Sequence, residues 1–205
     1  MSSIVKAIED AELMAGTEVN SVYVAVTGQH IKGENSKGVV AIANRQRTIT
    51  PVEIKRVIEA AQAVVIPVDR EILHVLSKEF AVDDQTGIKD PIGMSGVRLE
   101  SEVHIITGAS ASIQNLVKSI NKAGYQCADI IFSPLAAAEA VLSRDEKELG
   151  VALIDIGGGT TDIIVYVEGG VAYSSVLSVG AIHVTNDISI GLRTPLESAE
   201  VIKKK

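Results

Sequence analysis

The chain has 205 residues, a formal net charge of −7 and 46% hydrophobic residues, so it can bury the core of one large or two small globular domains. Its acidic balance argues against a broad nucleic-acid-binding surface, because such surfaces are basic; Lys203, Lys204 and Lys205 are only a small local exception. Cys127 is the only cysteine, which excludes an intramolecular disulfide and favours a reducing compartment. No apolar run is long enough to span a membrane, and aromatic residues at 3% favour an aliphatic core, as in α/β sheets flanked by helices.

The first 27 residues predict a helix followed by a strand. Apolar residues recur at near-helical spacing in residues 1–15, and Gly16 is placed to stop the helix. Residues 21–28, SVYVAVTG, have the continuous apolar pattern of a buried strand. Because a doubly wound domain normally opens with strands, this order predicts a truncated N-terminus.

Residues 28–97 differ in character and are predicted to form an inserted β-α-β-β module. Two short extended pieces are expected in residues 30–43, around a turn at residues 33–38, GENSKG. A strand is expected over residues 71–83, and residues 85–96 are expected to form a loop rich in Gly, Pro and Asp.

The helix of this module has a clear start signal. The sequence from Thr50 to Glu53, TPVE, is a capping box with proline at the first helical position, and Pro67 is placed beyond the helix end. Inserted subdomains fill their own core, so the helix should pack on the module's own strands, with few contacts to the glycine hairpin described below. The apolar face expected to do so consists of Ile54, Val57, Ile58, Ala61 and Val64.

Alternating strands and helices resume after the module. We expect a strand at residues 103–107, a helix at 111–123 and a strand at 127–132. Ser133 and Pro134 are expected to cap a helix that runs to Leu142. The next seven residues, SRDEKEL, are predicted to be a charged surface link.

The section from Val151 to Gly170, VALIDIGGGTTDIIVYVEGG, predicts two antiparallel strands joined by a glycine turn. Its first strand is apolar on both faces except at Asp155, so we expect it to be covered on both faces. A buried carboxylate at residue 155 then needs a cation or hydrogen-bond donors. Three successive glycines can take positive φ and let backbone N–H groups approach an anion closely. The residues therefore suggest half of a phosphate clamp, although glycine hairpins of this kind also occur in proteins that bind nothing.

The end of the chain continues the same sheet and then becomes helical. A third strand is predicted over residues 171–179, and Gly180 leads into a helix over residues 185–190 that Gly191 closes. Residues 194–197, TPLE, have the pattern of a second capping box that starts a further helix.

The motif D-x-G-G-G-T-T-D in a hairpin resembles the second phosphate loop of the actin, Hsp70 and sugar-kinase superfamily of ATP-binding proteins. That resemblance implies ATP and Mg²⁺ as cofactors, with Asp155 acting through the metal ion. Asp162 is expected to lie behind the phosphate-binding groups and support them. The groups implied to hold the phosphates are Gly157, Gly158, Gly159, Thr160 and Thr161.

Further segments make the resemblance specific to the FtsA family of bacterial cell-division proteins. They are SVYVAVTGQHI, GIKDPIGMSGVRLE, VHIITG, ELGVALIDIGGGTTDIIVY, TNDI and TPLESAEVIK, in this order and spacing. The resemblance implies an actin-like, ribonuclease-H-like α/β fold. It assigns residues 1–27 and 98–149 to a partial first lobe, 28–97 to the inserted subdomain, and 150–205 to the start of the second lobe. The same resemblance assigns three further residues to the nucleotide site: Gly180, Glu200 and Lys203.

The family resemblance also implies partners and a location. Proteins of this family polymerise on the inner face of the cytoplasmic membrane, anchor FtsZ filaments there and recruit later division proteins, the last expected here through the insertion. The resemblance further implies an internal section of a longer protein. A first phosphate loop, D-x-G-[ST], would precede it, and an adenosine motif and a membrane-targeting amphipathic helix would follow it.

Three alternatives remain open from the sequence. A pilus-assembly protein of the PilM kind shares the fold and a similar insertion. A phosphotransferase related to sugar or acetate kinases would need an acceptor pocket with a catalytic base, which the residues near the hairpin do not offer. A structural domain without a ligand is the third.

Any ATP hydrolysis is expected to be slow, so no catalytic residue is assigned. In actin-like relatives the strand end that matches Ser133 presents a Gln or Glu that orients the attacking water. Ser133 cannot act as a general base, and losing one typically slows a reaction about 10²-fold to 10⁴-fold. Glu139 lies nearly two helical turns further on and is not expected to reach the same water.

Overall fold

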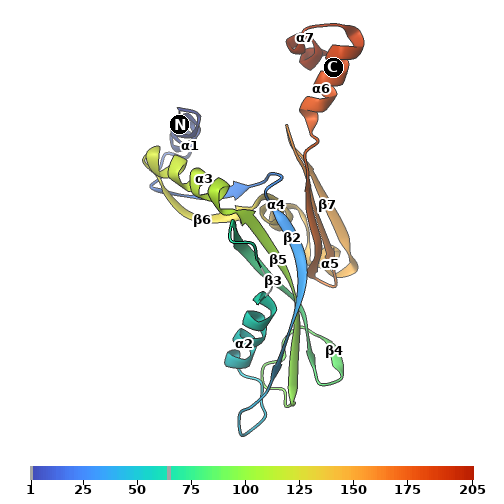
Figure 1. Ribbon diagram of the computed structural model, residues 1–205. Coiled ribbons are helices and arrows are strands. Elements are labelled where there is room, and N and C mark those ends of the chain that lie inside the picture. The colour runs from blue at the N-terminus through green and yellow to red at the C-terminus, as the bar shows by residue number, and fades with distance from the viewer. Residues whose placement is uncertain (1, 64–65) are drawn as a thin grey trace.

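The computed structural model describes residues 2–63 and 66–205 of the protein, and within them three β-sheets form the framework (Figure 1). We keep the names first lobe, insertion and second lobe for the parts built on the two-stranded, the four-stranded and the three-stranded sheet, respectively. No helix in the described part of the chain is long and apolar enough to cross a membrane.

The first lobe is built on two parallel strands. β1 (Ser21–Val26) pairs with β6 (Gln126–Phe132), and the segment that precedes β1 is helix α1 (Ser2–Ala15). α3 (Ser110–Lys122) makes the crossover that leads into β6, and α4 (Ser133–Val141) follows it. These elements were predicted, but the N-cap of α4 is Phe132, which carries no side-chain cap, so the expected capping role of Ser133 is wrong.

The insertion is a four-stranded antiparallel sheet with one helix on it. The strand order is β2-β5-β3-β4, with β2 (Lys32–Ala41), β3 (Arg70–Val82), β4 (Gln85–Ile88) and β5 (Arg98–Ala109). β4 lies in the segment that was expected to be a loop, where it forms a short hairpin with β3.

Helix α2 (Pro51–Gln62) covers one face of this sheet, and its capping box is confirmed by the reciprocal bonds between Thr50 and Glu53. Val57 is fully buried against Leu99 and Phe80, with Ile54 and Ile58 beside them. Ala61 packs with Val103 and Ile105. The predicted inward face is thus confirmed, except for Val64, which lies outside the described residues.

β2 is one continuous strand, so the turn expected at residues 33–38 is wrong. Its two glycines serve close packing instead of a turn. A Cβ at Gly38 would lie 2.1 Å from the carbonyl oxygen of Val57 and 2.6 Å from the backbone nitrogen of Ala61, so α2 can approach β2 only where no side chain intervenes.

β5 joins the insertion to the rest of the chain. It pairs with β2 from Lys32↔Thr107 to Ala41↔Arg98, and with β3 along its other edge. Residues 98–109, assigned from sequence to the first lobe, therefore belong to the insertion's sheet, because hydrogen-bonded pairing crosses the expected boundary at residue 97. The division into domains itself stays a prediction.

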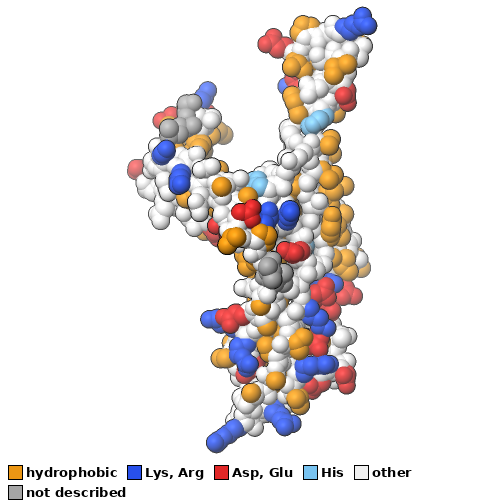
Figure 2. All heavy atoms as spheres, viewed as in Figure 1, with side chains coloured by type: hydrophobic (Ala, Val, Ile, Leu, Met, Phe, Trp, Pro, Cys, Tyr) orange, Lys and Arg blue, Asp and Glu red, His pale blue; other side chains and the backbone are white. Residues whose placement is uncertain are grey.

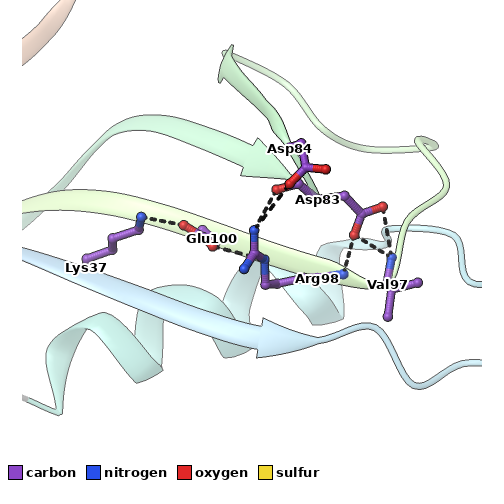
Figure 3. A network of polar contacts seen from close by, with 6 residues as sticks. All are labelled: Lys37, Asp83, Asp84, Val97, Arg98 and Glu100. Carbon is purple, nitrogen blue, oxygen red and sulfur yellow. Dashed lines mark hydrogen bonds and ion pairs between the residues drawn. The ribbon is translucent and has the colours of Figure 1, made fainter.

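A network of charged side chains lies at the end of this sheet where β3 turns into β4 (Figure 3). The carboxylate of Asp83 accepts the backbone N–H groups of Val97 and Arg98, at 3.0 and 2.9 Å, and these bonds hold its pKa below the usual range. The Arg98 guanidinium donates to the Asp83 carbonyl and pairs with Glu100 at 3.0 Å, and Glu100 also pairs with Lys37. The network fixes the turn between β3 and β4 against β5.

The second lobe begins with a hairpin and a third strand. β7 (Val151–Ile156) pairs with β8 (Thr161–Val167), and β8 pairs with β9 (Gly170–Leu177). The segment before β7, expected to be a link, is the short helix α5 (Arg144–Leu149), which starts with a capping box between Ser143 and Glu146.

The last two helices project beyond the end of the second-lobe sheet (Figure 1). α6 (Ala181–Leu192) is longer than predicted, and its C-cap is Arg193, which has a left-handed φ of 54°. Gly191 lies inside the helix, so its expected role as the helix end is wrong. α7 (Leu196–Lys203) has Pro195 as its N-cap and no side-chain cap, so the capping box expected at residues 194–197 is wrong.

The second-lobe sheet buries one face and exposes the other. Leu153, Ile164 and Tyr166 are buried against α4, whereas Ile154 and Ile156 are 59% and 69% exposed. Apolar side chains gather along this sheet in Figure 2, while charged side chains are concentrated on the insertion. The expectation that β7 is covered on both faces is therefore wrong for the described residues.

The insertion contacts the second lobe through β9. Buried His104 on β5 bonds Asn35 through Nδ1 at 2.5 Å and Ser174 on β9 through Nε2 at 2.7 Å. Asn35 in turn donates to the carbonyl of Ala172 at 2.9 Å. Burial lowers the pKa of the His104 imidazole, so the ring is neutral and satisfies both neighbours. Gly33 permits the contact, because a Cβ there would lie 2.1 Å from the Ser174 hydroxyl.

The role of Gly38 gives a stability prediction. Gly38→Ala should lower the free energy of unfolding by about 1–3 kcal/mol or more, because the clash is with backbone atoms that no side-chain rotation relieves. Gly191→Ala is a matched control, since its Cβ meets open space inside a helix; it should raise the free energy by about 0.5–1 kcal/mol. Urea unfolding followed by circular dichroism measures both, and equal stabilities would contradict the packing described here.

Candidate functional site

The predicted hairpin is present, and it places two carboxylates side by side. Asp155 on β7 is directly opposite Asp162 on β8, and both lie at the end of the strands next to the glycine turn. Side chains directly opposite in an antiparallel pair are about 5 Å apart at Cβ, so the two carboxylates are close enough to repel each other. The hairpin tip therefore concentrates negative charge where a cation can be held.

The glycine turn has a compact and open form. The N–H of Gly157 donates to the carbonyl of Thr160 at 2.8 Å, which closes the turn. Gly158 and Gly159 are exposed, and a Cβ on either would meet nothing within 4 Å. Within the described residues no hydrogen bond uses the N–H groups of Gly158 or Gly159. These two groups are free to face an anion.

The three glycines of the turn do not use the positive φ that was expected of them. None of the three has a positive φ, so left-handed conformations are not what the turn requires. Close packing instead constrains Gly180, which lies directly on the turn. A Cβ at Gly180 would lie 2.7 Å from the Gly157 carbonyl oxygen and 2.8 Å from backbone atoms of Gly158.

Helix α6 starts on the turn itself. The N–H groups of Ala181 and Ile182 donate to the carbonyls of Gly157 and Gly158, at 2.9 and 2.8 Å. The hydroxyl of Thr161 donates to the carbonyl of Val179 at 2.7 Å, which fixes the connection that leads into the helix. The Thr161 hydroxyl, expected to hold phosphate, is thus already engaged within the protein.

Asp162 is buried and is met by a residue of the first lobe. Only 2% of it is exposed, and the hydroxyl of Thr27 donates a hydrogen bond to its Oδ1. Burial raises the pKa of the Asp162 carboxyl, the bond from Thr27 offsets part of that shift, and the Asp155 carboxylate raises it further. Asp162 is therefore placed to support the site rather than to touch a ligand directly.

The residues present fit a hydrated metal ion but not a complete protein cage. Among the residues that the structure describes, no group of three or more His, Cys, Asp or Glu side chains could hold a metal. Mg²⁺ commonly takes one or two carboxylates, keeps several waters and completes its shell with substrate phosphates. Asp155 beside the free glycine N–H groups matches that donor set.

Two further predicted residues form a separate cluster between α6 and α7. The Glu200 carboxylate pairs with Lys203 at 2.6 Å and accepts the Thr185 hydroxyl at 2.6 Å. Hydrogen bonds from Lys203 and Thr185 lower the pKa of Glu200 to about 2. Lys203 also donates to the carbonyl of Ala181, the first residue of α6. The cluster therefore locks α7 onto the helix that starts at the glycine turn.

Sequence reasoning missed two residues of this region, Thr27 and Thr185. A lone threonine at a strand end or inside a helix carries no local signal, and Thr27 meets Asp162 across 135 positions of the chain.

Ser133 is the first residue of α4, and the Glu139 carboxylate is paired with Lys147 at 2.6 Å. Slow hydrolysis stays a prediction.

Two family models match the chain. Residues 28–107 match the SHS2 domain inserted in FTSA, and residues 152–205 match the cell division protein FtsA. The first match extends past residue 97, in agreement with the pairing of β5 in the insertion's sheet.

Curated relatives cover nearly the whole chain. The cell division protein FtsA of Pseudomonas aeruginosa is 48% identical over 203 residues, and that of Borreliella burgdorferi is 49% identical over 203 residues. Each alignment covers 99% of this chain but only 48% and 49% of the respective relative. The chain thus spans about half the length of the curated relatives it matches.

A solved structure, the PilM-PilN type IV pilus biogenesis complex, shares the fold with a TM-score of 0.68 at 14% identity, over 99% of this chain and 56% of that one. A likeness at this identity concerns the fold alone, so it does not favour the pilus-assembly alternative over the family matches. The predicted fold class, an actin-like α/β lobe with an inserted α+β subdomain, is confirmed. With two family models and near-complete alignments to curated relatives in agreement, the chain belongs to the FtsA family of cell-division proteins.

Proposed function

We propose that the protein binds ATP with Mg²⁺ at the tip of the β7–β8 hairpin. The observation that carries this proposal is the pair of free N–H groups of Gly158 and Gly159 beside the Asp155 carboxylate. Backbone donors bind phosphate oxygens, and a bound divalent ion removes the repulsion between phosphate and carboxylate.

Each predicted residue except Thr161, whose hydroxyl is engaged within the protein, then has a defined part in the proposed site. Gly158, Gly159 and Thr160 offer donors to the phosphates, and Asp155 holds the metal ion through its carboxylate. Gly157 and Gly180 shape the turn by close backbone contact. Glu200 and Lys203 hold α7 on α6 and so determine which surface faces the nucleoside.

We further propose that the complete protein is a cell-division adaptor of the cytoplasmic membrane's inner face. It would polymerise, anchor FtsZ filaments and recruit later division proteins through the insertion, with nucleotide acting as a switch. Family membership supports the cell-division role. The charged surface of the insertion, which lies away from the hairpin tip, supports a recognition role for it (Figure 2).

The nucleotide site gives a binding prediction for the protein expressed from its complete gene. Gly158→Val should lower affinity for Mg-ATP about tenfold or more, because its side chain would stand between the backbone N–H groups and the phosphates. The fold should be intact, since the Cβ meets open space. Asp155→Asn should weaken binding only when Mg²⁺ is present. Isothermal titration calorimetry measures both; unchanged affinity in folded variants would refute the assignment. Thr86→Val on β4 of the insertion is the control, since residue 86 is exposed, with thermal unfolding as the check on folding.

The adaptor role gives a second prediction. The protein from its complete gene should co-sediment with FtsZ filaments, whereas a pilus-assembly protein should not. Replacing residues 28–109 by a short linker should leave Mg-ATP binding measurable but impair filament formation or recruitment of later partners. The cut follows the observed sheet, so no strand is left unpaired. It also removes Ile31 and Ile106, which pack with Phe132 of the first lobe, so circular dichroism must first establish that the deletion variant is folded. A folded deletion variant that assembled normally would argue against the proposed role of the insertion.

A further inference from the structure

Thr27 lies where the first lobe, the insertion and the β7–β8 hairpin of the second lobe meet. It directly follows β1 of the first lobe and precedes Gly28, where the insertion match begins. The turn around it is well defined, because Gly28 has a φ of +140° and its carbonyl accepts the Ile31 N–H at 2.9 Å. The Thr27 side chain is therefore presented from a fixed backbone.

The partner of Thr27 is the buried carboxylate behind the hairpin tip. Its hydroxyl donates to Oδ1 of Asp162, which is only 2% exposed. A buried carboxylate without a donor is costly, so the hydroxyl does more for Asp162 than an exposed bond would. This is a side-chain hydrogen bond between the first lobe and the phosphate hairpin.

The position of Asp162 in turn affects Asp155. The two residues are directly opposite on β7 and β8, where like charges repel. The hydrogen bond from Thr27 holds the Asp162 carboxylate toward the first lobe. The Asp155 carboxylate is then the acidic group of the pair that faces the glycine turn. The position of the first lobe is thereby linked to the group that would hold the metal ion.

We propose that Thr27 is a positioning residue for the metal-nucleotide site, acting through Asp162 on Asp155. This inference rests on the proposed function, since it concerns the same hairpin. Because Thr27 is also the last residue before the insertion, this hydrogen bond connects nucleotide binding at the hairpin with the placement of the insertion, in addition to the contact between β9 and His104.

The test compares Thr27→Val, which keeps the shape and removes the hydroxyl, with Thr27→Ser, which keeps the hydroxyl. In the protein from its complete gene, titration calorimetry with Mg-ATP should give a dissociation constant raised about tenfold for the valine variant. The serine variant should restore most of the affinity. With ATP in EDTA the valine substitution should have little effect, because the metal-dependent part of the affinity is what Thr27 supports. Thr86→Val on β4 is the matched control for the same substitution elsewhere.

The possible outcomes separate the inference from the proposed function. A valine variant that is folded and binds Mg-ATP as tightly as the unmodified protein would overturn the inference and leave the nucleotide site standing. An equal loss of affinity with and without Mg²⁺, or no recovery with serine, would also overturn it, since both indicate a merely structural role. If the unmodified protein does not bind Mg-ATP, the proposed function fails and the inference fails with it.

Discussion

The backbone contact between Gly180 and the glycine turn is the constraint on which the second lobe depends. A side chain at residue 180 has no room, because its Cβ would lie 2.7 Å from the Gly157 carbonyl oxygen. The contact lets the first N–H groups of α6 bond the carbonyls of the turn. Helix N-termini leave N–H groups unpaired unless other groups accept them, and here the turn does so. With its carbonyls used toward α6, the turn keeps the Gly158 and Gly159 N–H groups free.

The contact between Gly180 and the glycine turn also positions α6 and α7. α6 begins at the turn, and α7 is held on it by Thr185, Glu200 and Lys203. The residues that the family resemblance assigned to the nucleoside are therefore connected to the phosphate loop by bonded elements. A shift of the turn would move α6 and α7 with it.

β9 connects this site to the insertion. One end of the strand pairs with Thr161 beside the turn, and Ser174 further along bonds buried His104 of the insertion's sheet. Thr27 makes the corresponding connection on the first-lobe side. The proposed nucleotide site and the proposed recognition module are thus joined twice, which is what a nucleotide-dependent adaptor requires.

Much of this arrangement is readable from local sequence. The hairpin, the crossover helix α3 and the capping box at Thr50 were predicted, because each depends on residues close together in the chain. The capping pattern at residues 194–197 failed although it looks the same, since the side chain of Thr194 makes no cap bond to α7.

Other features could not be predicted because they depend on distant residues. Gly33 and Gly38 look like turn residues but serve close packing against Ser174 and α2. β5 continues into the insertion because of pairing partners 17 to 75 positions away along the chain. Thr27 has a role only because Asp162, 135 residues later, folds back onto it.

The most direct test of the account is hydrogen–deuterium exchange of the protein from its complete gene, with and without Mg-ATP. The N–H groups of Gly158 and Gly159 are exposed and unpaired within the described structure, so they should exchange fast in the free protein. Mg-ATP should slow exchange in peptides covering residues 155–162, while peptides from β4 and the following loop should not change. Protection confined to other regions, with the glycine turn still exchanging fast, would contradict the proposed phosphate site.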